Sequence, residues 1–294
     1  MAQQSIEWAL SQGLINSGHR LRRLRGADPA GLAGRACPEG PTDRLRLLAD
    51  LISWLFVMDD ACDEDGLGAA PTLLAPTVAA LLDVLDVHGA STDGPAAATA
   101  GPPGEALGDL CRRVSAAGTP ALLLRFVGGV RDYLLALLWE AANREHGRVP
   151  EVAEYVQMRR HTGAVHPSFA LTELAIGTLS GAASRTDPAL VALDLLAADL
   201  VCWCNDLFSY GKENLDQADV HNLVVVIAGG RSGRDESSAL RAAADRFNES
   251  LSAYLTTEAA LLASGDDDLR SAVTARRNWI RATYDWSLAA ARYA

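Results

Sequence analysis

In the stretch LISWLFVMDDACDED, residues 51–65, an apolar run passes directly into a cluster of acids. The six residues DDACDE, 59–64, carry four carboxylates immediately after the eight-residue run LISWLFVM. An ionised carboxylate is costly to bury, and several together are worse unless cations compensate them. The stretch therefore predicts a buried helix face and leaves open which groups compensate the acids at its end.

The same helical pattern extends over most of the chain. Ala, Leu and Arg are abundant, and apolar residues recur at intervals of three and four. A helix over 119–147 has Pro at its first turn and Gly after its last, the usual start and stop signals. The other predicted helices are 42–65, with Thr42 as a cap, 150–177, with breaks at Gly163 and Pro167, 187–219, 235–264 and 266–293.

Two segments depart from this pattern. NLVVVI, residues 222–227, is the one run typical of a strand, although it is short enough to be ambiguous. GASTDGPAAATAGPPGE, residues 89–105, is predicted as a mobile loop, with no change in composition that would indicate a domain boundary. We therefore predict an all-α fold in which residues 1–294 form a single-domain bundle of about ten helices.

Charge and composition exclude some classes of function. The 294 residues include 26 Lys+Arg and 37 Asp+Glu, which gives a formal net charge of −11 and argues against nucleic acid or an anionic membrane as the main partner. No run of roughly 18 apolar residues indicates a membrane span, and the N-terminal residues lack the features of a signal peptide. The five cysteines are odd in number and match no zinc pattern, which favours reduced thiols and a cytoplasmic protein.

The first acidic motif has two interpretations. Asp59 and Asp63 are four residues apart, and Asp60 and Asp63 are three apart, so they share one helical face. A solvated helix end is the simpler interpretation, although acids at a C-terminus oppose the helix dipole. A divalent cation is the alternative, because Mg²⁺ takes hard oxygen ligands.

A second oxygen-rich motif, NDLFSYGKE at 205–213, also ends an apolar helix. Asn205, Ser209 and Glu213 are spaced by four residues and stack along one face, so an amide, a hydroxyl and a carboxylate could share one hard cation. Lys212 next to them suits phosphate. An ordinary polar helix face explains this triplet alone, but two such motifs together favour a metal site.

Two further places offer positive charge to an anionic ligand. Arg159 and Arg160 lie just before the break at Gly163, and Arg292 and Tyr293 lie at the extreme C-terminus. Surface arginines and a fraying terminus explain these residues equally well on their own.

With these motifs in order, the chain resembles a bacterial class I terpene synthase along most of its length. DDACDE resembles the family's aspartate-rich DDxxD motif, and NDLFSYGKE matches its NDxxSxxxE motif. Arg159 precedes Asn205 by the interval at which the family has its diphosphate-sensing arginine. Thr162 and Gly163 fall at the family's linker and helix-break effector positions, although some members have Asp at the first. The terminal RY resembles the family's pair that contacts diphosphate.

The resemblance implies the class I terpene synthase fold, with its helices around a central apolar cavity, and a role for each motif. Three Mg²⁺ ions would bind the diphosphate of a linear isoprenoid, with Asp60 pairing with an arginine once the site closes. Arg159, Thr162 and Gly163 would be catalytic. The metal ligands would be Asp59, Asn205, Ser209 and Glu213, with Asp63 as a further ligand, and the diphosphate-binding residues would be Arg159, Lys212, Arg292 and Tyr293.

The mechanism that follows is leaving-group catalysis. Positive charge stabilises the departing diphosphate, and a dry, apolar cavity protects the carbocation from water. Helical spacing from the two motifs, together with two tryptophans on the last helix, predicts the cavity wall. For the two tryptophans, ordinary core packing is the alternative. The predicted wall residues are Ile52, Leu55, Phe56, Val201, Cys202, Trp279 and Trp286.

Several alternatives stay open at this level. Aliphatic Leu55 and Val201 indicate a wide pocket, which favours a C20 substrate. The bacterial family favours C15, and C15 is therefore preferred narrowly. A chain-elongating prenyltransferase would need a second DDxxD motif, whose place is taken here by the residues 205–213. A helical, non-catalytic diphosphate-binding protein is a third option, and a homodimer would be compatible with the fold.

Overall fold

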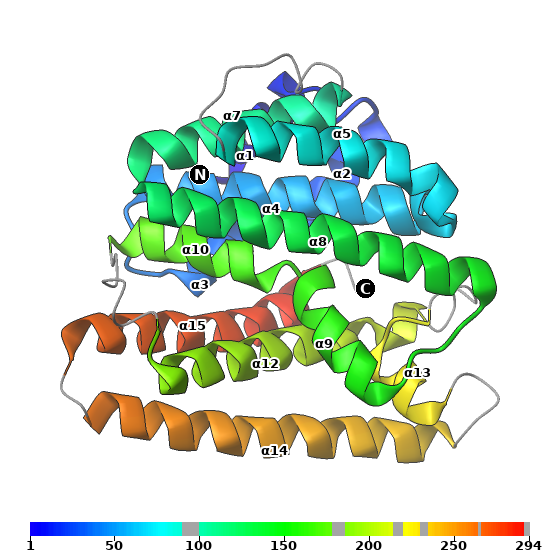
Figure 1. Cartoon of the computed structure of the whole chain (residues 1–294), viewed down its shortest axis with the longest axis vertical. Helices are drawn as coiled ribbons and strands as arrows, with labels where there is room; N and C mark the ends of the chain where they lie inside the picture. The colour runs from blue at the N-terminus through cyan, green and yellow to red at the C-terminus, as the bar shows by residue number, and fades with distance from the viewer. Residues whose placement is uncertain (90–99, 178–185, 214–219, 230–234, 264–265, 291–294) are drawn as a thin grey trace.

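Every regular element in the described part of the chain is helical (Figure 1). The computed structural model describes residues 1–89, 100–177, 186–213, 220–229, 235–263 and 266–290. These residues form thirteen α-helices and one 3-10 turn, which confirms the all-α prediction. The number exceeds the predicted ten because short helices precede the acidic motif and follow the second motif.

The helices have the following bounds: α1 Ala2–Ser11, α2 Gly18–Ala27, α3 Pro29–Ala36, α4 Thr42–Asp63, the 3-10 turn η1 Leu67–Ala69, α5 Pro71–Gly89, α7 Gly101–Ala117, α8 Pro120–His146, α9 Val152–Thr162, α10 Val165–Ile176, α12 Pro188–Glu213, α13 Leu223–Ala228, α14 Glu236–Ala263 and α15 Asp267–Ala289.

Helix α8 begins and ends where its sequence signals predict. The Thr119 hydroxyl accepts a hydrogen bond from the Leu122 backbone N–H at 3.2 Å, and Pro120 occupies the first turn. Gly147 ends the helix in the left-handed region, with φ of 57°. These caps set the two ends of α8, and its position comes from packing on α5 and α10.

Two predicted boundaries were wrong. Thr42 is the first helical residue of α4 and does not cap it, since Pro41 holds the cap position. Pro167 does not break a helix, because it lies in the first turn of α10, where no intrahelical N–H bond is lost. The chain breaks at Gly163 and Ala164, and Ala164 takes a positive φ of 49°.

The ambiguous run at 222–227 is helical. The Asn222 side chain accepts a hydrogen bond from the Val224 N–H at 2.9 Å and caps α13. The C-terminal part of the predicted loop at 89–105 is helical, because α7 already begins at Gly101 with prolines in its first turn. Residues 90–99 of that loop lie outside the described residues.

The helices pack around one large apolar core. Helices α4 and α8 run through the middle, α5 and α7 cover one side, and α12, α15 and α14 lie on the other (Figure 1). The short helix α3 packs on both α4 and α15, and α10 packs on α8 and α4. The buried apolar cluster extends from Ile6 to Trp286. Helices that are distant in sequence therefore meet around a common centre.

One helix in the described residues, Pro71–His88 of α5, is long and apolar enough to span a membrane by length and composition. A single helix of this kind is weak support for a membrane span. In this fold α5 packs along α7 and α8.

Candidate functional site

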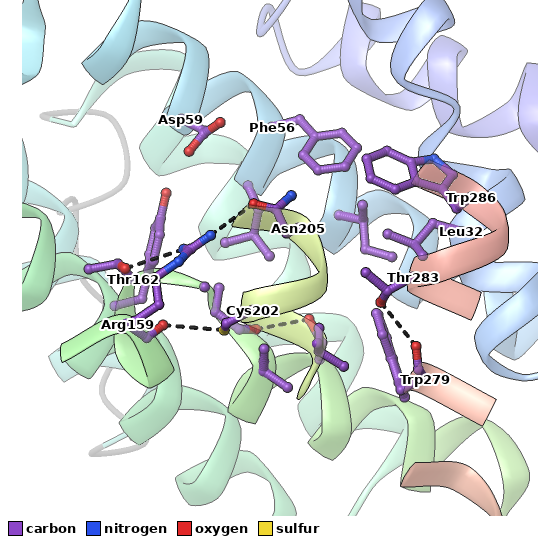
Figure 2. Close-up of a pocket in the computed structure, with 18 residues that line it drawn as sticks. Leu32, Phe56, Asp59, Arg159, Thr162, Cys202, Asn205, Trp279, Thr283 and Trp286 are labelled. Carbon is purple, nitrogen blue, oxygen red and sulfur yellow. Dashed lines mark hydrogen bonds between the residues drawn. The ribbon is translucent and has the colours of Figure 1, made fainter. Parts of the chain in front are cut away.

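A cavity lies between α3, α4, α8, α9, α10, α12 and α15, and it brings together the motifs that the sequence singles out (Figure 2). All seven predicted wall residues line it. Asp59, Arg159, Thr162, Gly163 and Asn205 line it as well. Figure 2 shows Asp59, Arg159 and Asn205 toward one side and the α15 residues Trp279, Thr283 and Trp286 toward the other.

Aromatic side chains on the α15 side are held in place by hydrogen bonds. Phe56 and Trp286 stack with ring centroids 5.6 Å apart and planes inclined by 22°. The Trp286 indole N–H donates to the Ala27 carbonyl at 2.8 Å, and the Trp279 indole N–H donates to the Thr172 hydroxyl at 2.7 Å. Because both indole N–H groups are hydrogen-bonded to residues that do not line the cavity, the rings can offer their apolar surface to it.

The acidic motif at the end of α4 is divided between the cavity and nearby arginines. Asp59 lines the cavity. Asp60 pairs with Arg23 of α2 at 2.8 Å, and Asp63 pairs with Arg144 of α8 at 2.5 Å. The structure therefore brings Asp59 to the cavity together with Asn205, whereas the Oδ1 atom of Asp63 is turned to an arginine.

The second motif is joined to α9 through Arg159. Arg159 Nη2 donates to Asn205 Oδ1 at 2.8 Å, and Arg159 Nε donates to Asp206 Oδ1 at 3.0 Å. Asp206 is 1% exposed and also accepts from the Tyr155 hydroxyl at 2.5 Å and the Leu223 N–H at 3.2 Å. Burial alone would lower the pKa of Arg159, but the charge of Asp206 raises that pKa above its usual range. The guanidinium is thus a fixed cation at the cavity.

The remaining predicted ligands are placed only in part. The Ser209 hydroxyl is buried, donates to the Asp206 carbonyl at 3.4 Å and lies 3.5 Å from the Asn222 amide. Lys212 and Glu213 form the end of α12, but their side chains lie outside the described residues, and so do Arg292 and Tyr293.

The break between α9 and α10 is packed directly against α12. A Cβ atom at Gly163 would lie 2.4 Å from Cys202 Sγ and 3.1 Å from the Arg159 carbonyl oxygen, so only glycine fits. The Cys202 thiol donates to that same carbonyl at 3.4 Å, and burial raises its pKa to about 12. Thr162 accepts a hydrogen bond from Arg159 Nη1 at 3.4 Å. The break thus links the arginine to the cavity wall.

A divalent cation fits the donors at the polar end of the cavity. Within the described side chains, no three His, Cys, Asp or Glu residues gather into a metal-binding group. The predicted donors are of mixed type, with the Asp59 carboxylate and Asn205 amide at the cavity and the Ser209 hydroxyl one turn further along α12. Oxygen donors of these kinds suit Mg²⁺, and Glu213 is one further turn along the same helix.

Several residues that line the cavity or support it were missed from the sequence. Asp206 lies inside the second motif, and its position next to Asn205 could have indicated that it belongs to the site. Tyr133 was not recognised; its hydroxyl is buried and has no hydrogen-bond partner among the described residues, and burial, with the charges of Cys62 and Asp59, raises its pKa. The other missed wall residues are Leu32, Ala164, Val165, Ser168 and Thr283.

Comparison with known proteins identifies relatives over the whole chain. Residues 50–253 match the family model described as terpene synthase family 2, C-terminal metal binding. A 4-epi-cubebol synthase, farnesyl diphosphate cyclizing, from Streptosporangium roseum is 33% identical over 99% of this chain and 86% of its own length. A (+)-T-muurolol synthase, also farnesyl diphosphate cyclizing, from Roseiflexus castenholzii is 35% identical over 99% of this chain and 88% of its own length.

Solved structures agree in fold. Wild-type cucumene synthase is 26% identical and superposes with a TM-score of 0.80, covering 98% of this chain and 94% of that one. An α-eudesmol synthase is 22% identical with a TM-score of 0.83 over 97% of this chain and 92% of that one, a likeness of fold alone.

Proposed function

The chain belongs to terpene synthase family 2, and from that premise we propose that it ionises farnesyl diphosphate and cyclises the resulting carbocation to a terpene hydrocarbon or alcohol. As a class I terpene synthase it is a lyase that acts on a phosphate ester. Two relatives that align with nearly the whole chain are named for cyclising farnesyl diphosphate, and this supports the C15 substrate.

One observation carries the proposal: a single cavity joins Asp59, Arg159 and Asn205 to a wall of aliphatic and aromatic residues. The polar residues would hold the diphosphate, and the apolar wall would hold the isoprenoid chain. This division matches a substrate with a charged head and a hydrocarbon tail.

Magnesium, when bound, would supply positive charge that stabilises the departing diphosphate. We propose that Asp59, Asn205, Ser209 and Glu213 hold a cluster of three ions, with Asp63 as a further ligand once Arg144 releases it. The family's metal-binding domain supports a metal here, and the number of ions is part of the proposal.

The chain's own residues would bind and orient the leaving group. Arg159 is cationic and is anchored by Asp206, so its other N–H groups can donate to diphosphate oxygens. Lys212, Arg292 and Tyr293 are proposed as further contacts to those oxygens. Thr162 and Gly163 would transmit a shift of Arg159 to the wall, because Cys202 packs on the same turn.

The apolar wall would exclude water and stabilise the carbocation. Phe56, Trp279 and Trp286 lie around the cavity, and a desolvated aromatic face can contribute about 2 kcal/mol to a nearby cation. Ile52, Leu55 and Val201 complete the wall without offering a nucleophile.

The same proposal covers the setting of the enzyme. We propose that residues 1–294 form one catalytic domain, supported by a buried cluster from Ile6 to Trp286. Five buried cysteines, all in the free form, support a cytoplasmic location. A membrane or nucleic acid is not a proposed partner, and a homodimer stays a prediction for light scattering.

The experiment is to incubate the purified protein and Mg²⁺ separately with C10, C15, C20 and C25 linear diphosphates and to analyse hexane extracts by GC–MS. We expect a cyclic product from the C15 substrate that is lost in Asp59→Ala. A product from the C20 substrate alone would favour a diterpene synthase. Longer linear chains on addition of isopentenyl diphosphate would indicate a prenyltransferase, and diphosphate binding without any product would indicate a non-catalytic protein.

A further inference from the structure

We propose that the Tyr133 hydroxyl is an additional hydrogen-bond donor to the diphosphate group at the polar end of the cavity. This inference rests on the proposed function, because it assigns a substrate contact within the same site. Tyr133 is not among the diphosphate-binding residues that the sequence predicted.

The ring of Tyr133 is held rigidly. Its side chain projects from α8 and is only 2% exposed. The ring packs edge-on against Trp54 of α4, with centroids 6.2 Å apart and planes inclined by 63°. Trp54 is fixed in turn, since its indole N–H donates to the Pro103 carbonyl at 3.0 Å. The direction of the hydroxyl is therefore set by packing on both helices.

The hydroxyl has no hydrogen-bond partner in the described part of the chain, although its oxygen is buried. A buried polar group without a partner destabilises the folded protein, and most such groups in native proteins are satisfied. Tyr133 lines the cavity that Asp59 and Arg159 also line. A ligand in this cavity would supply the missing acceptor.

The chemistry of the acceptor follows from the donor and its surroundings. At neutral pH a tyrosine hydroxyl carries its proton and can donate it. A hydrocarbon chain offers no acceptor, whereas diphosphate oxygens are strong ones. The carboxyl groups whose charges act on the hydroxyl are Asp59, Asp63 and Glu140, so it lies near the acidic motif. An ordered water is the rival acceptor, and it would instead serve to quench the carbocation.

The test compares Tyr133→Phe with the wild-type protein and with Tyr254→Phe. Tyr254 is a matched control, because its hydroxyl is buried, donates to the Val273 carbonyl at 3.4 Å and does not line the cavity. Calorimetric titration with inorganic diphosphate in Mg²⁺ should give about tenfold weaker binding for Tyr133→Phe alone. Without ligand, Tyr133→Phe should melt at or above the wild-type temperature, since no native hydrogen bond is lost.

Two results would overturn the inference, and a third would overturn only the proposed function. Unchanged diphosphate affinity in Tyr133→Phe would rule out the proposed contact. If the affinity is unchanged while the yield of terpene alcohol falls, the hydroxyl binds a water molecule instead of diphosphate. A lower melting temperature than that of Tyr254→Phe would show a structural role. If the wild-type protein binds diphosphate but converts no isoprenoid, the proposed function fails while the Tyr133 comparison can still be scored.

Discussion

Arg159 donates from Nη2 to Asn205 Oδ1 at 2.8 Å, and this hydrogen bond joins α9 to the second oxygen-rich motif on α12. The same guanidinium donates through Nε to the buried carboxylate of Asp206. Arg159 therefore contacts both Asn205, a proposed metal ligand, and Asp206, the carboxylate that anchors the arginine. A ligand that draws Arg159 or Asn205 toward itself acts on both helices.

Asp206→Asn should weaken both catalysis and stability. The variant leaves the buried guanidinium of Arg159 without its counter-charge, which costs about 3 kcal/mol when one partner of a buried pair is removed. Turnover of farnesyl diphosphate should fall by about 100-fold, because Arg159 is no longer held toward the diphosphate. Denaturant unfolding and steady-state kinetics measure the two effects.

The control for this prediction is Tyr155→Phe, which removes one hydrogen bond to Asp206 and leaves the charges in place. Its cost should be about 1 kcal/mol. If Asp206→Asn is no more harmful than Tyr155→Phe, the ion pair does not anchor the arginine.

Gly163→Ala should slow turnover because the new methyl group overlaps Cys202 Sγ. The added Cβ would lie 2.4 Å from that sulfur, and overpacking of this kind costs roughly 1–3 kcal/mol. Glycine is not needed here for a left-handed conformation, since φ is −72°. Steady-state kinetics and thermal melts of the single variant measure the effect.

The double variant Gly163→Ala/Cys202→Ala supplies the decisive comparison. Removing the sulfur should restore part of the lost stability, and the contact with the Arg159 carbonyl limits the recovery. Strictly additive effects of the two changes would contradict the proposed packing.

Asp59→Asn should be far more damaging than Asp63→Asn. Asp59 lines the cavity, whereas Asp63 is held by Arg144 at 2.5 Å. We expect kcat to fall by more than about 100-fold for Asp59→Asn and by about tenfold or less for Asp63→Asn. Titrating each variant with Mg²⁺ separates loss of metal affinity from loss of fold. Equal losses would mean that Asp63 is as essential a ligand as Asp59, which would contradict this prediction.

Glu154→Gln should lower stability in a manner that depends on pH. The Arg148 side chain, with the Trp139 indole N–H, lowers the pKa of Glu154 to about 2. A depressed pKa stabilises the folded state above the unfolded value of about 4.3, and that contribution is lost as pH falls toward 2. The Glu154 side chain is 34% exposed and is screened by solvent. We therefore expect no more than about 1 kcal/mol at pH 7.

Thermal melts of the wild-type protein and Glu154→Gln at pH 7 and at pH 3 measure this difference. It should be larger at pH 7. A difference that grows on acidification would assign the effect to something other than the ionised carboxylate.

The sequence predicted the long helices well because their apolar spacing and caps are local signals. Helix α8 shows this, with its Thr119 cap, Pro120 and terminal Gly147. The run NLVVVI was harder, because β-branched residues favour strands and only the Asn222 cap indicates a helix. Pro167 was read as a break, although at the first turn of a helix proline is tolerated.

The site was predictable along each helix but not across helices. Spacing from Asp59 and Asn205 suffices to name Ile52, Leu55 and Val201, because residues three, four and seven apart share a face. Nothing local indicates that Leu32 reaches the same cavity from α3. Nor does anything local indicate that Tyr133 lies there with a hydroxyl that no described residue pairs with. Those placements depend on tertiary packing between elements far apart in the sequence.

The most direct test offers an equimolar mixture of farnesyl and geranylgeranyl diphosphates to the wild-type protein in Mg²⁺. Diphosphate release and volatile products are followed together by a coupled assay and GC–MS. The account predicts that farnesyl diphosphate is consumed first, with one diphosphate released for each cyclic C15 product. Consumption of geranylgeranyl diphosphate alone, or the absence of any cyclic product, would contradict it.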